Sequence, residues 1–266
     1  MTADGWCVWL YAVTDADAEF AAGDLTGVSG ERVRPVQAAE FTAIVSDVAE
    51  PEFGEAALRR NLEDLHWLEK TAREHHGVIE ALASRGPVVP MRLATVYDSD
   101  AGLASTLEER AADLQRALSR VRACREWGVR GYVTEPAAGD TGPGEGGPAD
   151  GQAAGPGAAY LQRRRTQLNA RENLRREAMS SAQAIYAELS HHSAAARMYP
   201  PQSPELSGQA ASMVLNAAYL VTDDGTREFK AAITALTDRY RSLQLVVTGP
   251  WPAYSFVAEA DARDTQ

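Results

Sequence analysis

The chain has 266 residues, which is long enough for two domains that each bury a hydrophobic core. Apolar residues make up 45% and charged residues 24% of the sequence, as is typical of a globular protein. The formal net charge is −11, and an acidic surface of this kind repels nucleic-acid phosphates and anionic lipid head groups. Composition therefore argues against nucleic acid and membranes as partners.

Targeting signals and cysteine usage point to the cytoplasm. No run of 18 apolar residues exists, so no membrane span is expected. The apolar residues 6–13 follow no basic flank and precede no typical cleavage site, so no signal peptide is expected. The two cysteines, Cys7 and Cys124, are expected to be free thiols rather than a disulfide or a metal site.

The first half of the chain predicts strands followed by helices. Residues 6–13 form an aromatic and β-branched run typical of a buried strand. Residues 32–37 alternate weakly, and Pro35 favours an edge strand, whereas residues 41–48 read as a central strand. Residues 55–82 carry one apolar stripe at helical spacing, which predicts a single long helix ended by Gly86 and Pro87.

The pattern then continues with strand, helix, strand. Residues 88–93 predict a strand, and Asp98 or Ser99 can cap a helix that runs to about residue 123. Residues 127–133 predict the last strand of this half. We expect two helices on one face of a mostly antiparallel sheet, which is an α/β sandwich related to the ferredoxin-like topology.

A linker and a second domain follow. Residues 136–157 contain eight Gly and four Pro and too little apolar surface to offset the entropy of ordering them. Residues 158–189 then predict a long helix, with strands expected near residues 195–199, 211–221 and 242–248 and a helix within 223–239. The predicted class is thus α+β with three parts: a domain over residues 1–135, a flexible linker over 136–157, and a ferredoxin-like domain with a leading helix over 158–266.

Three motifs that could carry chemistry fail on their context. Residues 142–147 satisfy the glycine pattern of dinucleotide sites but lack the strand and helix that such a site needs. Neither adjacent histidine pair can chelate from one helix face, and His75 lies on the apolar stripe as a hydrogen-bonded core histidine. Ser46 and Asp47 adjoin on a strand, but no nucleophile elbow accompanies them. The sequence therefore predicts no catalytic residue, no metal and no cofactor.

Arg92 is a candidate for a structural ion pair. It lies between apolar strand residues, so its guanidinium is expected to be partly buried and to need a carboxylate. Asp47 or Glu126 could supply that carboxylate. A contact between Arg92 and a partner protein is the alternative.

Two groups of residues are candidates for partner binding. Six arginines crowd residues 163–176 and include Arg163, Arg164 and Arg165. The absence of interleaved aromatic residues argues against RNA, so a solvated face or a docking face remains. Trp251, Tyr254 and Phe256 follow a glycine–proline bend, either as core anchors or as an exposed aromatic patch.

The sequence also resembles a known family. Six segments match it in order, and they are IVSDV (44–48), NLEDLHWLE (61–69), VPMRLATVY (89–97), EWGVR (126–130), YLQRRR (160–165) and TGPWPAYSF (248–256). Together they resemble the GvpL/GvpF gas vesicle proteins over both predicted domains. The departures are small, since Met91, Leu93, Ala94 and Ala253 replace commoner residues and the linker is unusually long.

The resemblance implies a role in gas vesicle formation rather than a reaction. Members of this family bind the small hydrophobic shell protein and other accessory proteins, as assembly factors or minor vesicle components. We therefore expect a non-enzymatic binding protein located at gas vesicles in the cytoplasm. The alternative from another class is a small-molecule enzyme on a ferredoxin-like scaffold.

Overall fold

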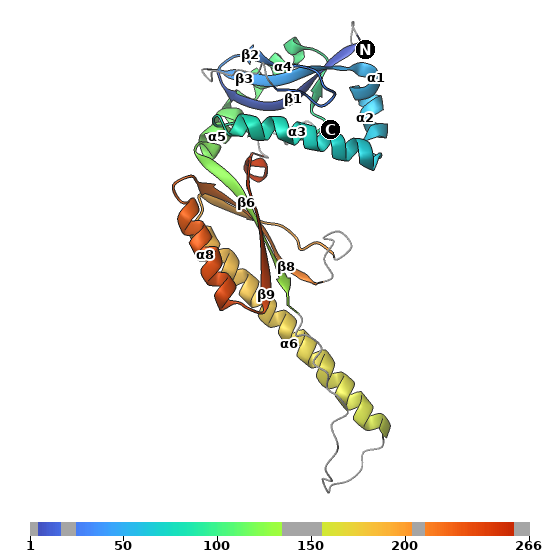
Figure 1. Cartoon of the computed structure of the whole chain (residues 1–266), viewed down its shortest axis with the longest axis vertical. Helices are drawn as coiled ribbons and strands as arrows, with labels where there is room; N and C mark the ends of the chain where they lie inside the picture. Colours follow the sequence, from blue (N-terminus) through green and yellow to red (C-terminus); the bar gives the residue numbers. More distant parts are fainter. Residues whose placement is uncertain (1–4, 17–24, 135–155, 204–210, 258–266) are drawn as a thin grey trace. The chain divides into compact units, whose positions relative to one another are not determined.

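A computed structural model describes residues 5–16, 25–134, 156–203 and 211–257 (Figure 1). The description excludes the side chains of residues 156–163, 167–168 and 170–171. Most of the predicted linker, residues 136–155, lies outside the described residues. No described helix combines the length and apolar character needed to cross a bilayer.

The chain divides into two compact units, which are described separately. Unit 1 comprises Met1–Trp127, Leu220–Asp223 and Gly249–Gln266, and unit 2 comprises Gly128–Tyr219 and Asp224–Thr248. Residues 249–257 group with unit 1, whereas the sequence analysis places them in the second domain. The expected domain boundaries at residues 135 and 158 stay a prediction.

Unit 1 contains a five-stranded sheet with strand order β2-β3-β1-β4, in which β5 also pairs with β1. The printed strand pairs are antiparallel, and β1 shifts register against β3 between Leu10 and Ala12. The three strands predicted within residues 6–48 are confirmed, with β2 at the edge and β3 inside. The elements of this unit are β1 (Trp6–Asp15), β2 (Val33–Ala38), β3 (Phe41–Ala49), α1 (Glu50–Phe53), α2 (Glu55–Asn61), α3 (Leu65–Ala83), β4 (Val89–Pro90), β5 (Val96–Tyr97), α4 (Asp100–Glu109), α5 (Ala111–Val121) and the 3-10 turn η2 (Tyr254–Phe256).

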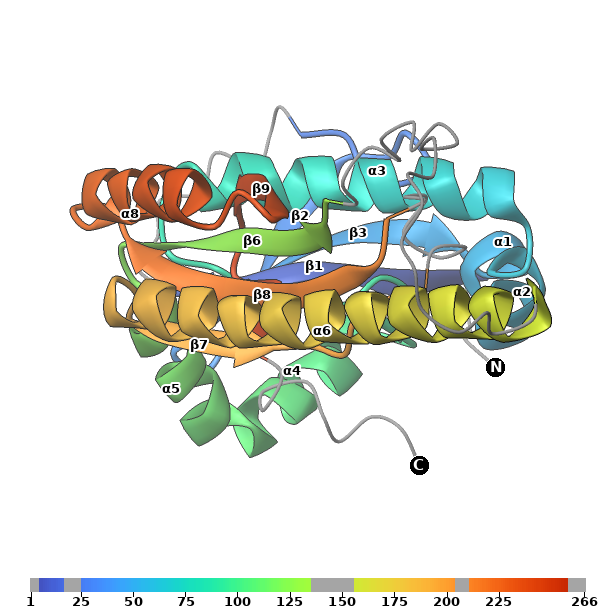
Figure 2. The ribbon, with the colours of Figure 1, turned by 90° about the horizontal axis from the view of Figure 1, so that it is seen from below.

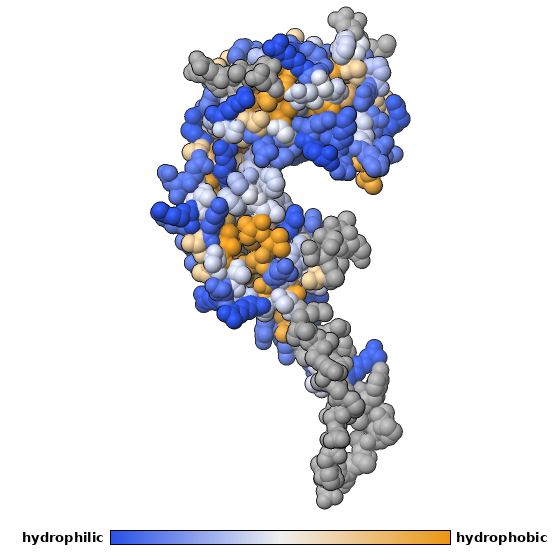
Figure 3. Space-filling view, in the orientation of Figure 1, coloured by the Kyte–Doolittle hydropathy of each residue, from blue (hydrophilic) through white to orange (hydrophobic). Residues whose placement is uncertain are grey.

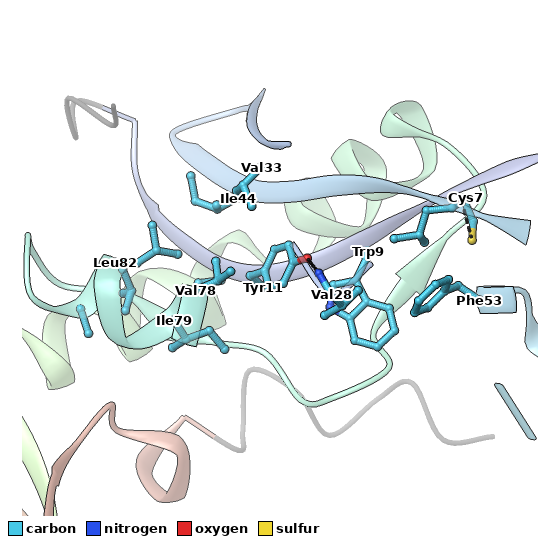
Figure 4. Close-up of a cluster of buried hydrophobic side chains, with 14 of the residues drawn as sticks. Cys7, Trp9, Tyr11, Val28, Val33, Ile44, Phe53, Val78, Ile79 and Leu82 are labelled. Atoms are coloured by element: carbon cyan, nitrogen blue, oxygen red, sulfur yellow. Dashed lines mark hydrogen bonds between the residues drawn. The ribbon is translucent and has the colours of Figure 1, made fainter. Parts of the chain in front are cut away.

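The first sheet is covered on both faces. All eight residues from position 7 to position 14 of β1 are buried, so neither face of this strand meets solvent. On one face, Trp9 and Tyr11 pack toward Val78 and Ile79 of α3 (Figure 4). Helices α4 and α5 contact β2, β1 and β4 and lie on the other side of the sheet (Figure 2). The expectation of two helices on one face is therefore wrong.

The single helix expected over residues 55–82 is two helices. α2 ends at Asn61 and α3 begins at Leu65, because the Asp64 side chain accepts hydrogen bonds from the backbone N–H groups of His66 and Trp67. Leu65 is 78% exposed, so it does not belong to the buried stripe. Periodicity alone could not show that a local cap interrupts the helix.

Two further elements of unit 1 differ from prediction in extent. The helix expected up to residue 123 is divided into α4 and α5 at Arg110, and Ser99 caps α4 as expected by accepting from the Gly102 N–H. The strand expected at residues 88–93 is the two-residue strand β4, with β5 separate from it. Short pairings of this kind leave little periodic signal in a sequence.

The second sheet has strand order β7-β8-β6-β9, and its strands β6, β8 and β9 contain residues of both units. Tyr219 of β8 contacts Tyr186 of α6 and Phe229 of α8, so both helices pack on the same face. The strand expected to close the first half is β6, and it belongs to this second sheet. The elements are β6 (Cys124–Val133), α6 (Pro156–His191), β7 (Ala195–Met198), β8 (Met213–Thr222), α8 (Thr226–Arg239) and β9 (Leu243–Trp251). The predicted α+β class with antiparallel sheets is confirmed.

Candidate partner-binding surface

The C-terminal segment after β9 is held by Glu126 of β6. The Glu126 carboxylate accepts hydrogen bonds from the Ser255 backbone N–H at 2.8 Å and from the Ser255 Oγ–H at 2.6 Å. Phe256 is buried, and its carbonyl accepts from Arg120 Nη1 at 3.1 Å. Glu126 and Phe256 thus fix this segment within unit 1, so Phe256 is a core anchor.

The two other aromatic residues of this segment flank His76 of α3. The Tyr254 hydroxyl lies 3.2 Å from His76 Nδ1, and the Trp251 ring centroid lies 5.5 Å from the His76 ring. Burial raises the pKa of the Tyr254 hydroxyl, and the carboxylates of Glu126 and Glu80 raise it further, so Tyr254 stays protonated. Trp251 is 39% exposed. Of the three aromatic candidates, Trp251 presents the most surface to a partner.

The arginine cluster lies in the first half of α6. Arg164 and Arg165 are exposed, and the side chain of Arg163 lies outside the described ones. Farther along α6, Arg176 Nε lies 3.6 Å from a Glu172 carboxylate oxygen, one helical turn away. Pairs of this kind fit a solvated helix face, and partner docking on it stays a prediction.

The structure places two of the three candidates for a structural ion pair differently from what was expected, and whether Arg92 pairs with Asp47 or Glu126 stays a prediction. Arg92 is exposed, so the expectation that its guanidinium is partly buried is wrong. Asp47 instead receives two hydrogen bonds from Arg34, at 2.8 and 2.5 Å, and Arg34 also binds Asp100 at 2.8 and 2.9 Å. Arg92 lies beyond the end of β4, which is only two residues long.

A buried polar network in unit 1 was missed by the sequence analysis. The Tyr11 hydroxyl accepts a hydrogen bond from the Val28 N–H at 3.0 Å (Figure 4). It also lies 2.9 Å from Ser46 Oγ. The Ser46 hydroxyl donates to Glu31 Oε1 at 2.5 Å, and the Ser29 N–H donates to Glu31 Oε2 at 2.7 Å. This network ties the loop at residues 28–31 to the sheet. The signal for it was available, because a tyrosine inside a wholly buried strand must find a partner for its hydroxyl.

His75 is the hydrogen-bonded core histidine that was expected. Its Nδ1 accepts from Trp9 Nε1 at 3.0 Å, so its Nε2 carries the proton and donates to the Met91 carbonyl at 3.0 Å. Burial lowers the pKa of His75 to about 4. The imidazole is therefore neutral at physiological pH, and both of its nitrogens are used in holding the core.

Metal and thiol chemistry find no support in the described part of the chain. Within it, no group of three or more histidine, cysteine, aspartate and glutamate side chains could hold a metal ion. Cys7 and Cys124 are both free thiols, but only Cys7 is buried as the sequence suggested, since Cys124 is half-buried. Burial raises the pKa of Cys7 to about 11. A buried thiol with such a pKa is a poor nucleophile.

Two antiparallel sheets, each packed against helices, and an aromatic C-terminal segment define an α+β protein without an evident catalytic constellation among its described residues. The family model of the gas vesicle synthesis protein GvpL/GvpF matches residues 7–258. The chain belongs to this family, and it is therefore a gas vesicle protein.

Known relatives agree with this assignment. The chain is 35% identical to gas vesicle protein L of Streptomyces sp. (strain CB03234) over 260 residues, which is 97% of this chain and 96% of the relative. The crystal structure of GvpF from Anabaena sp. PCC7120 is similar with a TM-score of 0.64 at 18% identity, covering 95% of this chain and 96% of that one. The crystal structure of GvpF from Microcystis aeruginosa is also similar, with a TM-score of 0.64 at 17% identity, and the match covers 94% of this chain and 98% of that one. The two structures support the fold.

Proposed function

We propose that this protein is a non-enzymatic assembly factor that binds the hydrophobic shell protein, and other accessory proteins, during gas vesicle formation. The observation that carries the proposal is membership of a gas vesicle synthesis family over residues 7–258. A shell protein that polymerises through apolar strands is an aggregation hazard before assembly, because its strand edges and apolar face are unpaired. A partner that covers those groups solves that problem, whether or not it remains in the finished vesicle.

Exposed apolar side chains support a binding role. Leu65 and Trp251 are 78% and 39% exposed. Large aromatic and aliphatic side chains at the surface are the usual anchors of a protein interface. Arg164 and Arg165 add a basic surface on α6 that suits an acidic accessory protein.

The alternative of a small-molecule enzyme has less support. Tyr11 and His75 have strongly shifted pKa values, raised and lowered respectively by burial, which is a common property of catalytic residues. Both, however, are inside the core of unit 1 and are engaged in the hydrogen bonds that hold it. Their shifts follow from packing and need no catalytic role.

The direct test is retention of the shell protein on the immobilised full-length chain at about 0.15 M and about 1 M salt. If apolar contact supplies most of the affinity, retention persists at high salt. Trp251→Ala is expected to reduce it, while Trp6→Ala serves as a matched variant at another exposed tryptophan of unit 1. Both variants are checked for an unchanged melting temperature.

The outcomes separate three models. Binding lost at high salt would show that charge holds the pair together. Equal binding by wild type and Trp251→Ala would remove Trp251 from the interface. No retention by the wild type at either salt concentration would refute direct binding of the shell protein.

A further inference from the structure

Two long strands end the sheets of this protein, and they are protected very differently. β2 ends the first sheet and β9 ends the second. In β2, Pro35 has no backbone N–H to donate to a further strand. Arg34 adds a charged side chain to β2, and this side chain forms ion pairs with Asp47 and Asp100. Helix α4 also contacts β2. Charge, proline and a covering element are the devices that keep an edge strand from pairing with another chain.

The outer strand β9 lacks two of these devices, charge and proline, along its residues in unit 2. Residues 243–248 read Leu-Gln-Leu-Val-Val-Thr, without a charged residue or a proline, in a protein with 24% charged residues. In the described part of the chain, β9 pairs with β6 on one side and ends the sheet on the other. Figure 3, in the orientation of Figure 1, shows an apolar patch over this strand.

Both faces of β9 contribute to this apolar character. A Cβ placed on Gly131 of β6 would meet Leu215 and Leu245, whereas one placed on Gly128 would meet Thr248. Positions 128 and 131 point to opposite faces of β6, so Leu245 and Thr248 also lie on opposite faces of the sheet. Leu245, Val246 and Val247 are each half-buried, in keeping with a strand that has a neighbour on one side only.

We infer that the outer edge of β9, at residues 243–248, accepts an extended, uncharged strand of a partner protein by β-sheet addition. Backbone hydrogen bonds would supply the pairing, and the half-buried valines and Leu245 would gain cover on both faces. The inference rests on the proposed function in naming the shell protein as that partner.

Charge selects this occupant over a second copy of the chain. Two copies would each bring a net charge of −11 and repel one another. An apolar strand brings no such repulsion and faces no charged side chain along residues 243–248. A highly charged strand would find no opposite charge on this edge to offset its desolvation.

The test uses the full-length chain and a synthetic peptide that copies one β-strand of the shell protein. Gln244 is exposed on β9 and Gln37 is exposed on β2, so Gln244→Lys and Gln37→Lys form a matched pair of edge charges. We expect Gln244→Lys to weaken binding of the peptide on the order of tenfold, and Gln37→Lys to leave it unchanged. Equal melting temperatures show that both variants are folded.

Two measurements test the backbone pairing itself. The same peptide N-methylated at alternate residues keeps its side chains but loses the N–H donors on one edge, so one of its two methylation patterns should not bind. Amide hydrogen exchange should slow at residues 243–248 when the unmodified peptide binds, and should stay unchanged at residues 33–38.

The results distinguish failure of the inference from failure of the proposed function. If the wild type retains the shell protein while Gln244→Lys binds equally well and β9 exchange is unaltered, the partner docks elsewhere and the inference is overturned. If sedimentation shows a dimer that Gln244→Lys dissociates, the occupant is a second copy and the inference is also overturned. If the shell protein is not retained at all, it is the proposed function that fails.

Discussion

The two sheets of this protein differ in how completely their strands are buried. In the first, β1 is buried along eight consecutive residues, and the polar groups of Tyr11, Ser46 and His75 inside it are hydrogen-bonded. In the second, α6 and α8 pack on one face, while β9 keeps three half-buried apolar residues at an edge without charge or proline over residues 243–248. The first arrangement favours stability. The second leaves apolar surface at the end of the sheet, and we therefore assign stability mainly to the first sheet and propose the second for binding.

The largest expected loss in the free energy of unfolding comes from a substitution in the core of the first sheet. Trp9 is fully buried, packs edge-on against Phe53 and His75 with ring centroids 5.6 and 5.7 Å away, and donates a hydrogen bond to His75. Trp9→Ala should lower the free energy of unfolding by about 3–5 kcal/mol. Val246→Ala on β9 removes a half-buried side chain and should cost about 1 kcal/mol or less. Urea denaturation measures both values, and equal losses would contradict the contrast between the sheets.

A second prediction concerns pH. The pKa of His75 is lowered by burial from its ordinary 6.5 to about 4 in the folded protein. Between these values the unfolded chain binds the proton and the folded one does not, so stability falls as the pH drops from about 6.5 toward 4. The loss from this residue is about 2 kcal/mol at pH 5.

His75→Gln isolates that contribution. Glutamine keeps a donor and an acceptor but cannot take up a proton, so its stability should change less between pH 7 and pH 5 than that of the wild type. Chemical denaturation at the two pH values measures the difference. An identical pH dependence in both proteins would show that His75 titrates normally, and that the first sheet is less tightly closed than its hydrogen bonds indicate.

The sequence predicted much of the fold because strong patterns report burial. The aromatic and β-branched run of β1 marked a strand, and the helical spacing of His75 marked a core position. The helix break at Asp64 was missed because a single cap overrides a periodic stripe that continues past it. The sheet that β6 joins was also missed, because strand pairing depends on long-range contacts that periodicity does not contain.

The candidate site residues were harder to predict than the elements. Their residue types were informative, but their exposure depends on tertiary neighbours. Phe256 is buried while Trp251, five residues earlier, is partly exposed, because Glu126 fixes the segment between Tyr254 and Phe256. Arg92 was expected to be partly buried because apolar residues flank it, yet the strand there is only two residues long and the side chain is exposed.

The smallest expected effects concern the edge of the first sheet, where Asp47 binds Arg34, a residue that the sequence analysis did not single out. Arg34 binds Asp47 and Asp100, and these carboxylates raise its pKa, but all three side chains are partly exposed, so solvent screens the pairs. Arg34→Ala should therefore cost about 1 kcal/mol. Arg92→Ala, at an exposed position, should cost about 1 kcal/mol or less, instead of the several kcal/mol that a buried pair would lose, because solvent screens the interactions of an exposed arginine. Thermal melts of the two variants, together with measurements of peptide binding, show whether Arg34 stabilises the sheet or keeps the edge of β2 from pairing with another strand.

If Arg34→Ala melts almost normally but gains strand binding at β2, its charge serves mainly to keep that edge unpaired. If it loses several kcal/mol and gains no binding, Arg34 holds the sheet together and the comparison of the two edges must rest on Pro35 and α4 alone.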